Sequence, residues 1–186
     1  MKRSTLDKLI STTGLLITLV LFAAAGGLFY AHNFIHNQVQ SQLAAQKITF
    51  PAAGTPGLTS LPAADQAAVG TYAGQQLLTG AQAEVFADHY IAVHLKEIGN
   101  GQTYADLSAA SLANPTDAKL AGQVQTMFRG ETLRGLLLNA YAFDTMATVA
   151  YYAAFVALVA GVVLMLLAAL GFTHAERAAA KPKKRR

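Results

Sequence analysis

Residues 146–172, MATVAYYAAFVALVAGVVLMLLAALGF, carry no charged side chain. At about 1.5 Å of rise per residue, a helix of this length extends roughly 40 Å, more than the ~30 Å hydrocarbon core of a bilayer. Apolar side chains would occur on every side of this helix, whereas a surface helix of a soluble protein keeps a polar face. The run therefore predicts a membrane-spanning helix. The alternative is a helix buried in the core of a large soluble protein.

A second uncharged run, residues 9–30, follows three basic residues near the N-terminus and is also long enough to cross a bilayer. A cleaved signal peptide is the alternative, because the alanines at 23–25 before Gly26 satisfy the small-residue cleavage pattern. Apolar and aromatic residues continue past that point to Phe34 and Ile35. This continuation favours a retained first span.

Composition agrees with a small membrane protein. Of the 186 residues, 53% are hydrophobic and 13% are charged, too apolar a balance for a typical soluble domain. Cysteine is absent, which excludes a disulfide framework, a thiolate nucleophile and a cysteine metal site. Neither apolar run contains an ionisable residue, so the two spans offer no carrier for a proton or ion path.

Charge distribution predicts the orientation. Basic residues dominate residues 1–8 and 173–186, whereas acidic residues outnumber basic ones between the two runs. The positive-inside rule then places both termini in the cytoplasm and residues 31–145 outside it, in a plasma membrane. Six basic residues of the tail are expected to lie on anionic lipid headgroups: Arg177, Lys181, Lys183, Lys184, Arg185 and Arg186. Nucleic-acid or specific lipid recognition is the alternative for this tail.

The region between the spans is predicted to be mostly helical, which makes the fold class an all-α membrane protein with a two-helix hairpin and an extracytoplasmic helical cap. Spacing of Ile35, Val39 and Leu43 extends the first span as an amphipathic stalk over 33–48. Residues 51–80, rich in proline and glycine, are expected to form an extended connector with at most a short turn or strand.

Three further helices follow in the prediction. An amphipathic helix covers 81–98 and ends at Gly99, and a short helix is capped by Thr103 with Asp106. A last helix, capped by Asn114, continues into the second span, with glycines at 130 and 135 where it could bend. Contacts are expected between Phe86, Ile91, Leu95 and Ile98 of the first of these helices and Leu133, Leu137 and Tyr141 of the last.

Four short motifs, in order along the chain, carry a resemblance to a known family. They are an SQL-x-x-x-KIT-like exit (Ser41, Gln42, Leu43, Lys47, Ile48 and Thr49), A-x-A-E-x-x-x-x-H (Ala81, Ala83, Glu84 and His89), G-x-T-Y-A-D-L (Gly101 and Thr103 to Leu107), and L-R-x-L-L from Leu133. In this order between two spans they resemble small actinobacterial membrane proteins that are often labelled aromatic ring-opening dioxygenases. The resemblance implies the two-span topology and leaves catalysis open.

The dioxygenase label can be tested residue by residue. Extradiol ring cleavage uses Fe(II) held by two histidines and a carboxylate. The candidates are His32, His36, His89 and His94 with Glu84, Asp88 and Glu97. His32 and His36 share a helical face but lack a nearby carboxylate, and His89 and His94, five apart, lie some 140° apart around a helix. We therefore expect no metal site and no cofactor; a metal-dependent oxygenase using His89, His94 and nearby carboxylates is the alternative function.

Other catalytic motifs are missing: the sequence has no Walker loop, dinucleotide fingerprint, G-x-S-x-G or H-E-x-x-H. Tyr151 and Tyr152 fit an interfacial aromatic belt. Small residues recur in both spans and predict close helix packing within the chain, with contact to a different protein as the alternative: Ala23, Gly26, Gly27, Ala153, Ala157 and Gly161. We predict a non-catalytic accessory or scaffold subunit of an envelope complex, for which a respiratory-chain assembly is one host. Its partners would be the lipid bilayer and other integral membrane subunits, with no nucleic acid and no evident small-molecule substrate.

Overall fold

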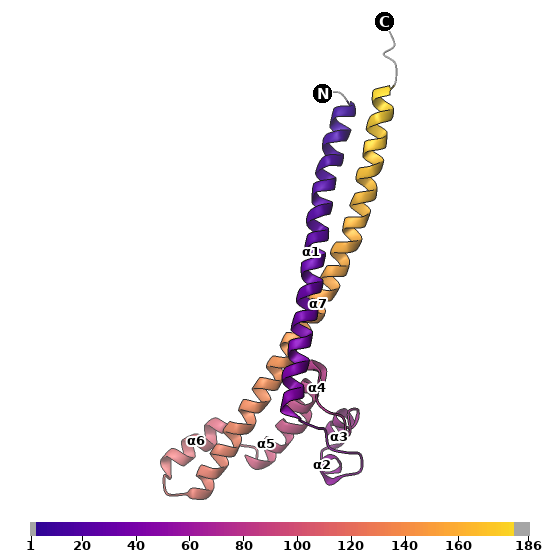
Figure 1. Cartoon of the computed structure of the whole chain (residues 1–186). Coiled ribbons are helices and arrows are strands. Elements are labelled where there is room, and N and C mark those ends of the chain that lie inside the picture. Colours follow the sequence, from indigo (N-terminus) through magenta and orange to yellow (C-terminus); the bar gives the residue numbers. More distant parts are fainter. Residues whose placement is uncertain (1–2, 181–186) are drawn as a thin grey trace. The chain divides into compact units, whose positions relative to one another are not determined.

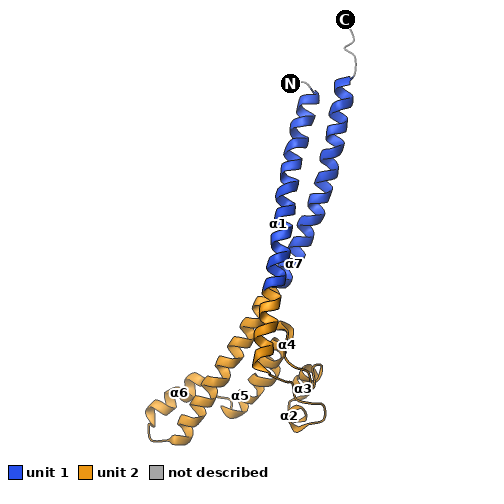
Figure 2. Cartoon of the chain, viewed as in Figure 1, with its two compact units in different colours: residues 1–34, 147–186 blue, residues 35–146 orange. Residues whose placement is uncertain are grey.

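The computed structural model describes residues 3–180 and shows an all-α fold in which the described residues contain no strand beyond an isolated bridge between Thr49 and Gln76. Its helical elements are α1 (Arg3–Gln46), α2 (Pro56–Thr59), α3 (Ala63–Gly70), α4 (Gly80–Val85), the π-helical η1 (Phe86–Ile91), α5 (Ala92–Ile98), α6 (Tyr104–Ala113) and α7 (Ala118–Ala180) (Figure 1). The chain divides into two compact units (Figure 2). Unit 1 comprises the described parts of 1–34 and 147–186, and unit 2 comprises Ile35–Met146.

Both apolar runs lie inside much longer helices. α1 continues past residue 30 to Gln46, which confirms the helical stalk, and Lys47 then ends it with a left-handed φ of 55°. α7 runs without a break into the second apolar run, which confirms the predicted continuation, and neither Gly130 nor Gly135 interrupts it. By length and composition, α1 and α7 are each able to cross a membrane.

The start of α7 differs from the prediction. We expected Asn114 as its cap, but the Asn114 side chain instead donates to the carbonyl of Ala110 at 3.0 Å and ends α6. α7 begins at Ala118, and the carboxylate of Asp117 accepts from the N–H of Leu120 at 3.0 Å. Asp117 therefore supplies the oxygen that an N-cap needs, three residues later than expected.

The 51–80 connector is also more ordered than an extended chain. Two of its three prolines lie at helix starts, with Pro56 in the first position of α2 and Pro62 just before α3. Proline suits a helix start because the missing N–H would have no partner there. Backbone bonds from Phe50 N–H to the Gln75 carbonyl and from Leu77 N–H to the Ile48 carbonyl, both 2.9 Å, hold the two ends of the connector together.

The predicted amphipathic helix over 81–98 is confirmed, with one feature that the pattern did not indicate. Thr79 and Gln82 form a capping box at its start, and Gly99 ends it. Between them lies the π-helical turn η1, which begins at the buried Phe86 and ends at the buried Ile91, five residues later. Further along, Leu95 is buried, whereas Ile98, an expected contact residue, is exposed.

Unit 2 has its own hydrophobic core, centred on Phe50. The Phe50 ring lies 5.3 Å from that of Tyr72 and 5.2 Å from that of Phe86. Buried residues from every helical element of unit 2 join it: Val39, Leu43, Leu58, Leu61, Val69, Leu77, Ala83, Ala87, Ile91, Leu95, Leu107, Met127 and Leu137. Of the expected α7 contacts Leu137 is buried, but Leu133 and Tyr141 are exposed. Leu95 packs against Gly130 of α7, which was not among the expected contacts.

Candidate functional site

The two long helices of unit 1 pack through small residues in a heptad repeat. Along α7 the buried positions recur every seventh residue: Ala147, Ala154, Gly161, Ala168 and Ala175. Along α1 they are Ser11, Thr18 and Ala25, also seven apart. A seven-residue repeat keeps one seam of a helix facing its partner over many turns. A Cβ at Gly161 or Gly171 would overlap Phe22 or Ser11, so glycine at these positions permits the close approach.

This seam includes only part of the set of small residues that four-residue spacing indicated. Gly161 is buried and Ala157 is partly buried, as expected for packing residues. Four other members of the predicted set, however, are exposed and lie outside the seam: Ala23, Gly26, Gly27 and Ala153. Spacing alone could not separate these residues from Ala25, because small residues occupy neighbouring positions on both helices.

Pairing of α1 with α7 can be tested with a designed disulfide. A Cβ built on Gly14 lies 3.6 Å from the Cβ of Ala168, within the range that a disulfide needs. Because the chain has no cysteine of its own, Gly14→Cys with Ala168→Cys should oxidise to an intramolecular bridge. Gel mobility before and after reduction measures it. Gly26→Cys with Ala168→Cys is the control, and equal bridging in both pairs would contradict the pairing.

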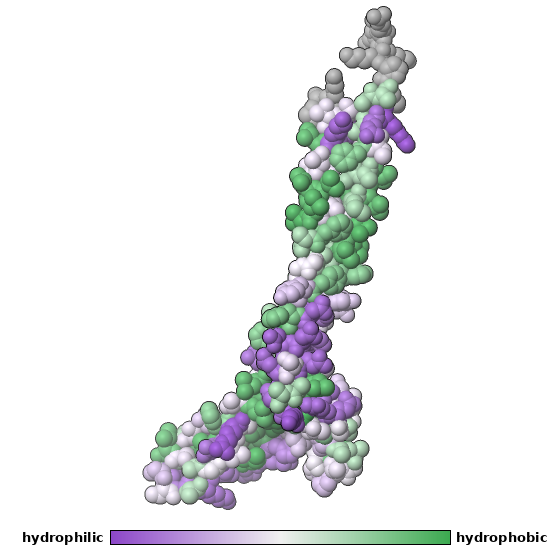
Figure 3. Space-filling view, viewed as in Figure 1, coloured by the Kyte–Doolittle hydropathy of each residue, from purple (hydrophilic) through white to green (hydrophobic). Residues whose placement is uncertain are grey.

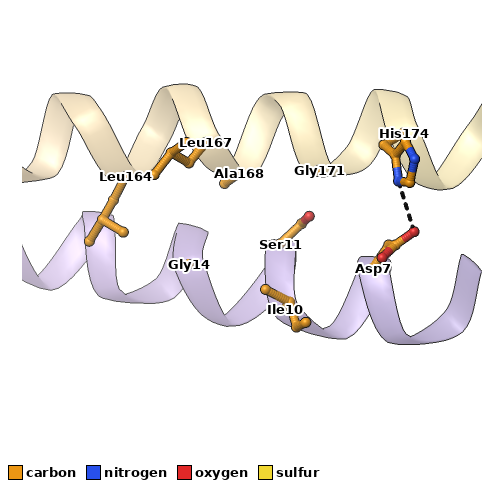
Figure 4. A pocket seen from close by; sticks show the side chains of 9 residues that line it. All are labelled: Asp7, Ile10, Ser11, Gly14, Leu164, Leu167, Ala168, Gly171 and His174. Carbon is orange, nitrogen blue, oxygen red and sulfur yellow. Dashed lines mark hydrogen bonds and ion pairs between the residues drawn. The ribbon is translucent and has the colours of Figure 1, made fainter. Parts of the chain in front are cut away.

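A groove of about 250 Å³ opens beside this seam, between α1 and α7 (Figure 4). Its walls are mostly apolar or small, and its lining residues are Asp7, Ile10, Ser11, Gly14, Leu164, Leu167, Ala168, Gly171 and His174. At one end, His174 Nδ1 lies 3.1 Å from Asp7 Oδ2, which joins the two helices. The groove therefore combines an apolar trough with a polar end.

Asp144 of α7 is bonded to two other helices of unit 2. One oxygen lies 2.8 Å from His36 Nδ1 on α1, and the other accepts the backbone N–H of Gly80, the first residue of α4, at 3.0 Å. A Cβ at Gly80 would overlap the Asp144 side chain. This carboxylate thus joins three helices and places negative charge at the N-terminus of α4, where the helix dipole favours it.

The remaining candidate histidines each have their own oxygen partner. His89 Nδ1 lies 2.8 Å from Asp65 of α3, and His94 Nδ1 lies 2.7 Å from the carbonyl of Tyr90. In unit 1, His32 Nδ1 lies 2.9 Å from the carbonyl of Ala147. Among residues 3–180, no three His, Cys, Asp or Glu side chains come close enough together to hold a metal ion. The described part of the chain therefore brings together no set of metal ligands that would support the metal hypothesis.

Of the acidic candidates, Asp88 has a structural partner. Arg134 of α7 donates to Asp88 Oδ1 at 2.8 Å and lies 3.6 Å from Glu131. The hydrogen bond to Asp88 raises the pKa of the Arg134 guanidinium. Arg134 belongs to the L-R-x-L-L motif, so this motif fastens α7 to η1. Glu84 is partly buried in α4, and Glu97 is exposed on α5.

The predicted capping of α6 is confirmed in detail. The Thr103 hydroxyl accepts from Asp106 N–H at 3.2 Å, and Asp106 Oδ2 accepts from Thr103 N–H at 3.0 Å. Hydrogen bonds from the Thr103 side chain and backbone lower the pKa of Asp106. This G-x-T-Y-A-D-L motif is thus a capping box, a structural role that needs no ligand.

The basic tail is described only in part. Arg177 is exposed in the last turn of α7, while the other five predicted headgroup ligands lie outside the described residues: Lys181, Lys183, Lys184, Arg185 and Arg186.

Large apolar side chains are exposed on the unit 2 part of α7 and were not singled out from the sequence. They include Phe128, Leu136, Phe143 and Met146, each at least 48% exposed.

Comparison with known protein families, with curated proteins and with solved structures finds no match. The resemblance to the actinobacterial membrane proteins therefore stays a prediction. Two of the motifs that carry it have structural roles here, one as a helix cap and one as an ion pair between helices.

Proposed function

We propose that the chain is an integral membrane protein with two antiparallel spans, both termini in the cytoplasm and unit 2 outside it. The exterior of unit 1 supports this proposal. Side chains such as Val20, Val156 and Leu170 are about two-thirds exposed in the chain by itself. Figure 3 shows hydrophobic residues, in green, over much of the visible surface of the two long helices of unit 1. A helix buried in a soluble core would hide these side chains, whereas a bilayer covers them without any protein partner. The distribution of basic residues supports the orientation.

The protein's role, in this proposal, is that of a non-catalytic accessory or scaffold subunit of an envelope complex. The observation that carries it is the apolar face of α7 in unit 2. Leu136 is 58% exposed and Phe143 is 48% exposed, and they lie seven residues apart on one side of the helix. Large apolar side chains left exposed on one side of a helix are typical of protein–protein contact surfaces. Another integral membrane subunit is the expected partner, and a respiratory-chain assembly is one host.

The polar groups of unit 2 support the same interpretation. Asp144, Asp65 and Asp88 each join one helix to another, through His36, His89 and Arg134 respectively. Their chemistry is thereby used to hold the fold. A metal-dependent oxygenase is the competing function, and iron retained by the purified protein together with turnover of a catechol would support it.

Topology is tested by cysteine labelling, which is clean because the natural chain has none. Single cysteines replace two exposed residues, Ala109 in α6 and Ala179 near the end of α7. A membrane-impermeant maleimide applied to intact cells should label Ala109→Cys and should label Ala179→Cys only after lysis. Labelling of Ala179→Cys in intact cells would overturn the proposed orientation, and extraction of the protein by alkaline carbonate would overturn its membrane insertion.

The scaffold role is tested by a photo-crosslinking amino acid placed at Phe143 and, as a control, at the exposed Gln40 of α1. We expect Phe143 to cross-link in cells to a membrane subunit that also co-purifies in mild detergent, and we expect Leu136→Asp to abolish both results. Cross-links to lipid alone from Phe143, with co-purification unchanged by Leu136→Asp, would contradict the proposed contact surface.

A further inference from the structure

The groove between α1 and α7 needs an apolar occupant if unit 1 spans a bilayer, so a ligand site there rests on the proposed membrane topology. Gly14 and Ala168 project too little side chain to fill it, and Ile10, Leu164 and Leu167 make its other walls apolar. Water gains few hydrogen bonds in such a trough. At about 250 Å³ it is smaller than the ~300–1,000 Å³ usual for pockets that enclose drug-sized ligands. A slender apolar group suits it.

Two arginines near the polar end of the groove indicate which chemical group the other end of the ligand carries. Arg3 precedes Asp7 by four residues on α1, and Arg177 follows His174 by three on α7. These spacings place each arginine one helical turn beyond the Asp7–His174 pair, on the same side of its helix. Both arginines are exposed, and neither belongs to a described ion pair. Two guanidinium groups one turn past an apolar trough suit a phosphate, which arginine binds through paired N–H groups.

We propose that this groove is a binding site for one anionic phospholipid of the cytoplasmic leaflet. One acyl chain lies along Ile10, Leu164 and Leu167, and the phosphate lies between Arg3 and Arg177. The Asp7–His174 pair closes the end of the groove between chain and headgroup. This site differs from non-specific attraction of the basic tail, because it requires the shape of the groove as well as charge.

The first test compares two glycines of α1 in the full-length protein. A Cβ at Gly14 meets only Ala168, at 3.6 Å, so the larger side chain of Gly14→Leu must extend into the groove, whereas Gly26→Leu has open space around it. The proteins are reconstituted in nanodiscs of phosphatidylglycerol and phosphatidylcholine in equal amounts, and the lipid retained after transfer to detergent is measured by native mass spectrometry. Gly14→Leu should lose the retained phosphatidylglycerol, and Gly26→Leu should keep it.

The headgroup is tested separately. Arg3→Gln and Arg177→Gln should each lower the preference for phosphatidylglycerol over phosphatidylcholine roughly fivefold. Glycerophosphoglycerol, which has the headgroup without acyl chains, should not displace the lipid at equal concentration. Retention that follows the arginines but ignores Gly14→Leu would overturn the groove site in favour of headgroup attraction alone.

A second measurement keeps the natural sequence, in case Gly14→Leu disturbs helix pairing. Phosphatidylglycerol with a diazirine on one acyl chain should label Ile10 and Leu167 more than the phosphatidylcholine analogue does, whereas Leu19 and Val20 on the outer face should be labelled equally by both lipids. The proposal would be overturned if the two lipids labelled all four residues equally. It would also be overturned if a helix of another protein covered the groove and blocked its labelling. Failure of membrane insertion itself would instead overturn the proposed function, so the two failures are distinguishable.

Discussion

Replacing Leu95 with alanine is expected to lower the free energy of unfolding by about 2–5 kcal/mol, the usual result of truncating a buried leucine. Leu95 is 5% exposed and packs against Gly130 of α7. The loss is large because a domain of this size is stable by only about 5–15 kcal/mol. Chemical unfolding of the full-length protein in detergent, followed by circular dichroism, measures it.

Gly130 provides the matched control. A Cβ at Gly130 would overlap Leu95 Cδ2, so Gly130→Ala should destabilise the natural protein. In the Leu95→Ala background the added methyl enters the space that Leu95 left. The double variant should therefore be more stable than the sum of the two single changes indicates. Additive losses would show that these two residues are not in contact.

The same measurement separates the scaffold and metal hypotheses. The side chains of the His89–Asp65 pair are 42% and 22% exposed, and ion pairs at such exposure contribute about 0–1 kcal/mol. His89→Ala should therefore destabilise the protein less than Leu95→Ala does. A larger loss from His89→Ala, reproduced in the natural protein by a chelator, would favour the metal-site hypothesis.

Long-period patterns predicted most of the helices correctly. Apolar runs and a continuous helical phase at Leu133, Leu137 and Tyr141 indicated that α7 enters the second run without a loop, and Thr103 with Asp106 indicated the α6 cap. The predicted start of α7 was wrong because two neighbouring residues can each cap a helix. Asn114 and Asp117 are both good caps, and in the structure the first ends one helix and the second begins the next.

Two features had no local signal in the sequence. The π-helical turn η1 depends on how Phe86 and Ile91 both reach the Phe50 core, which spacing within the helix does not reveal. Asp144 lies 64 positions from Gly80 and 108 positions from His36 along the chain. No motif therefore indicated these partners or the place of Asp144 at the start of α4. In unit 1, too many small residues lie side by side for periodicity to select the heptad seam.

Replacing Asp144 with alanine should be the most damaging change to a polar residue of unit 2, at about 2–3 kcal/mol of unfolding free energy. It leaves the N–H of the buried Gly80 without its acceptor and removes a negative charge from the start of α4. Loss of the His36 bond adds less, because the His36 side chain is 43% exposed and can turn to water. Better helix propensity of alanine offsets up to about 0.7 kcal/mol.

Asp65→Ala is the matched control, because Asp65 lies at the same 2.8 Å from a histidine Nδ1, yet no backbone N–H of another described helix is seen to donate to it. We expect it to cost about 0–1 kcal/mol. Amide exchange distinguishes the two variants further: residues 80–83 should exchange faster in Asp144→Ala and unchanged in Asp65→Ala. Asp144→Asn, which keeps an oxygen for Gly80, should recover most of the protection. If Asp65→Ala proves as destabilising as Asp144→Ala, the junction at the start of α4 has no special role, and the carboxylates of unit 2 contribute only as surface ion pairs.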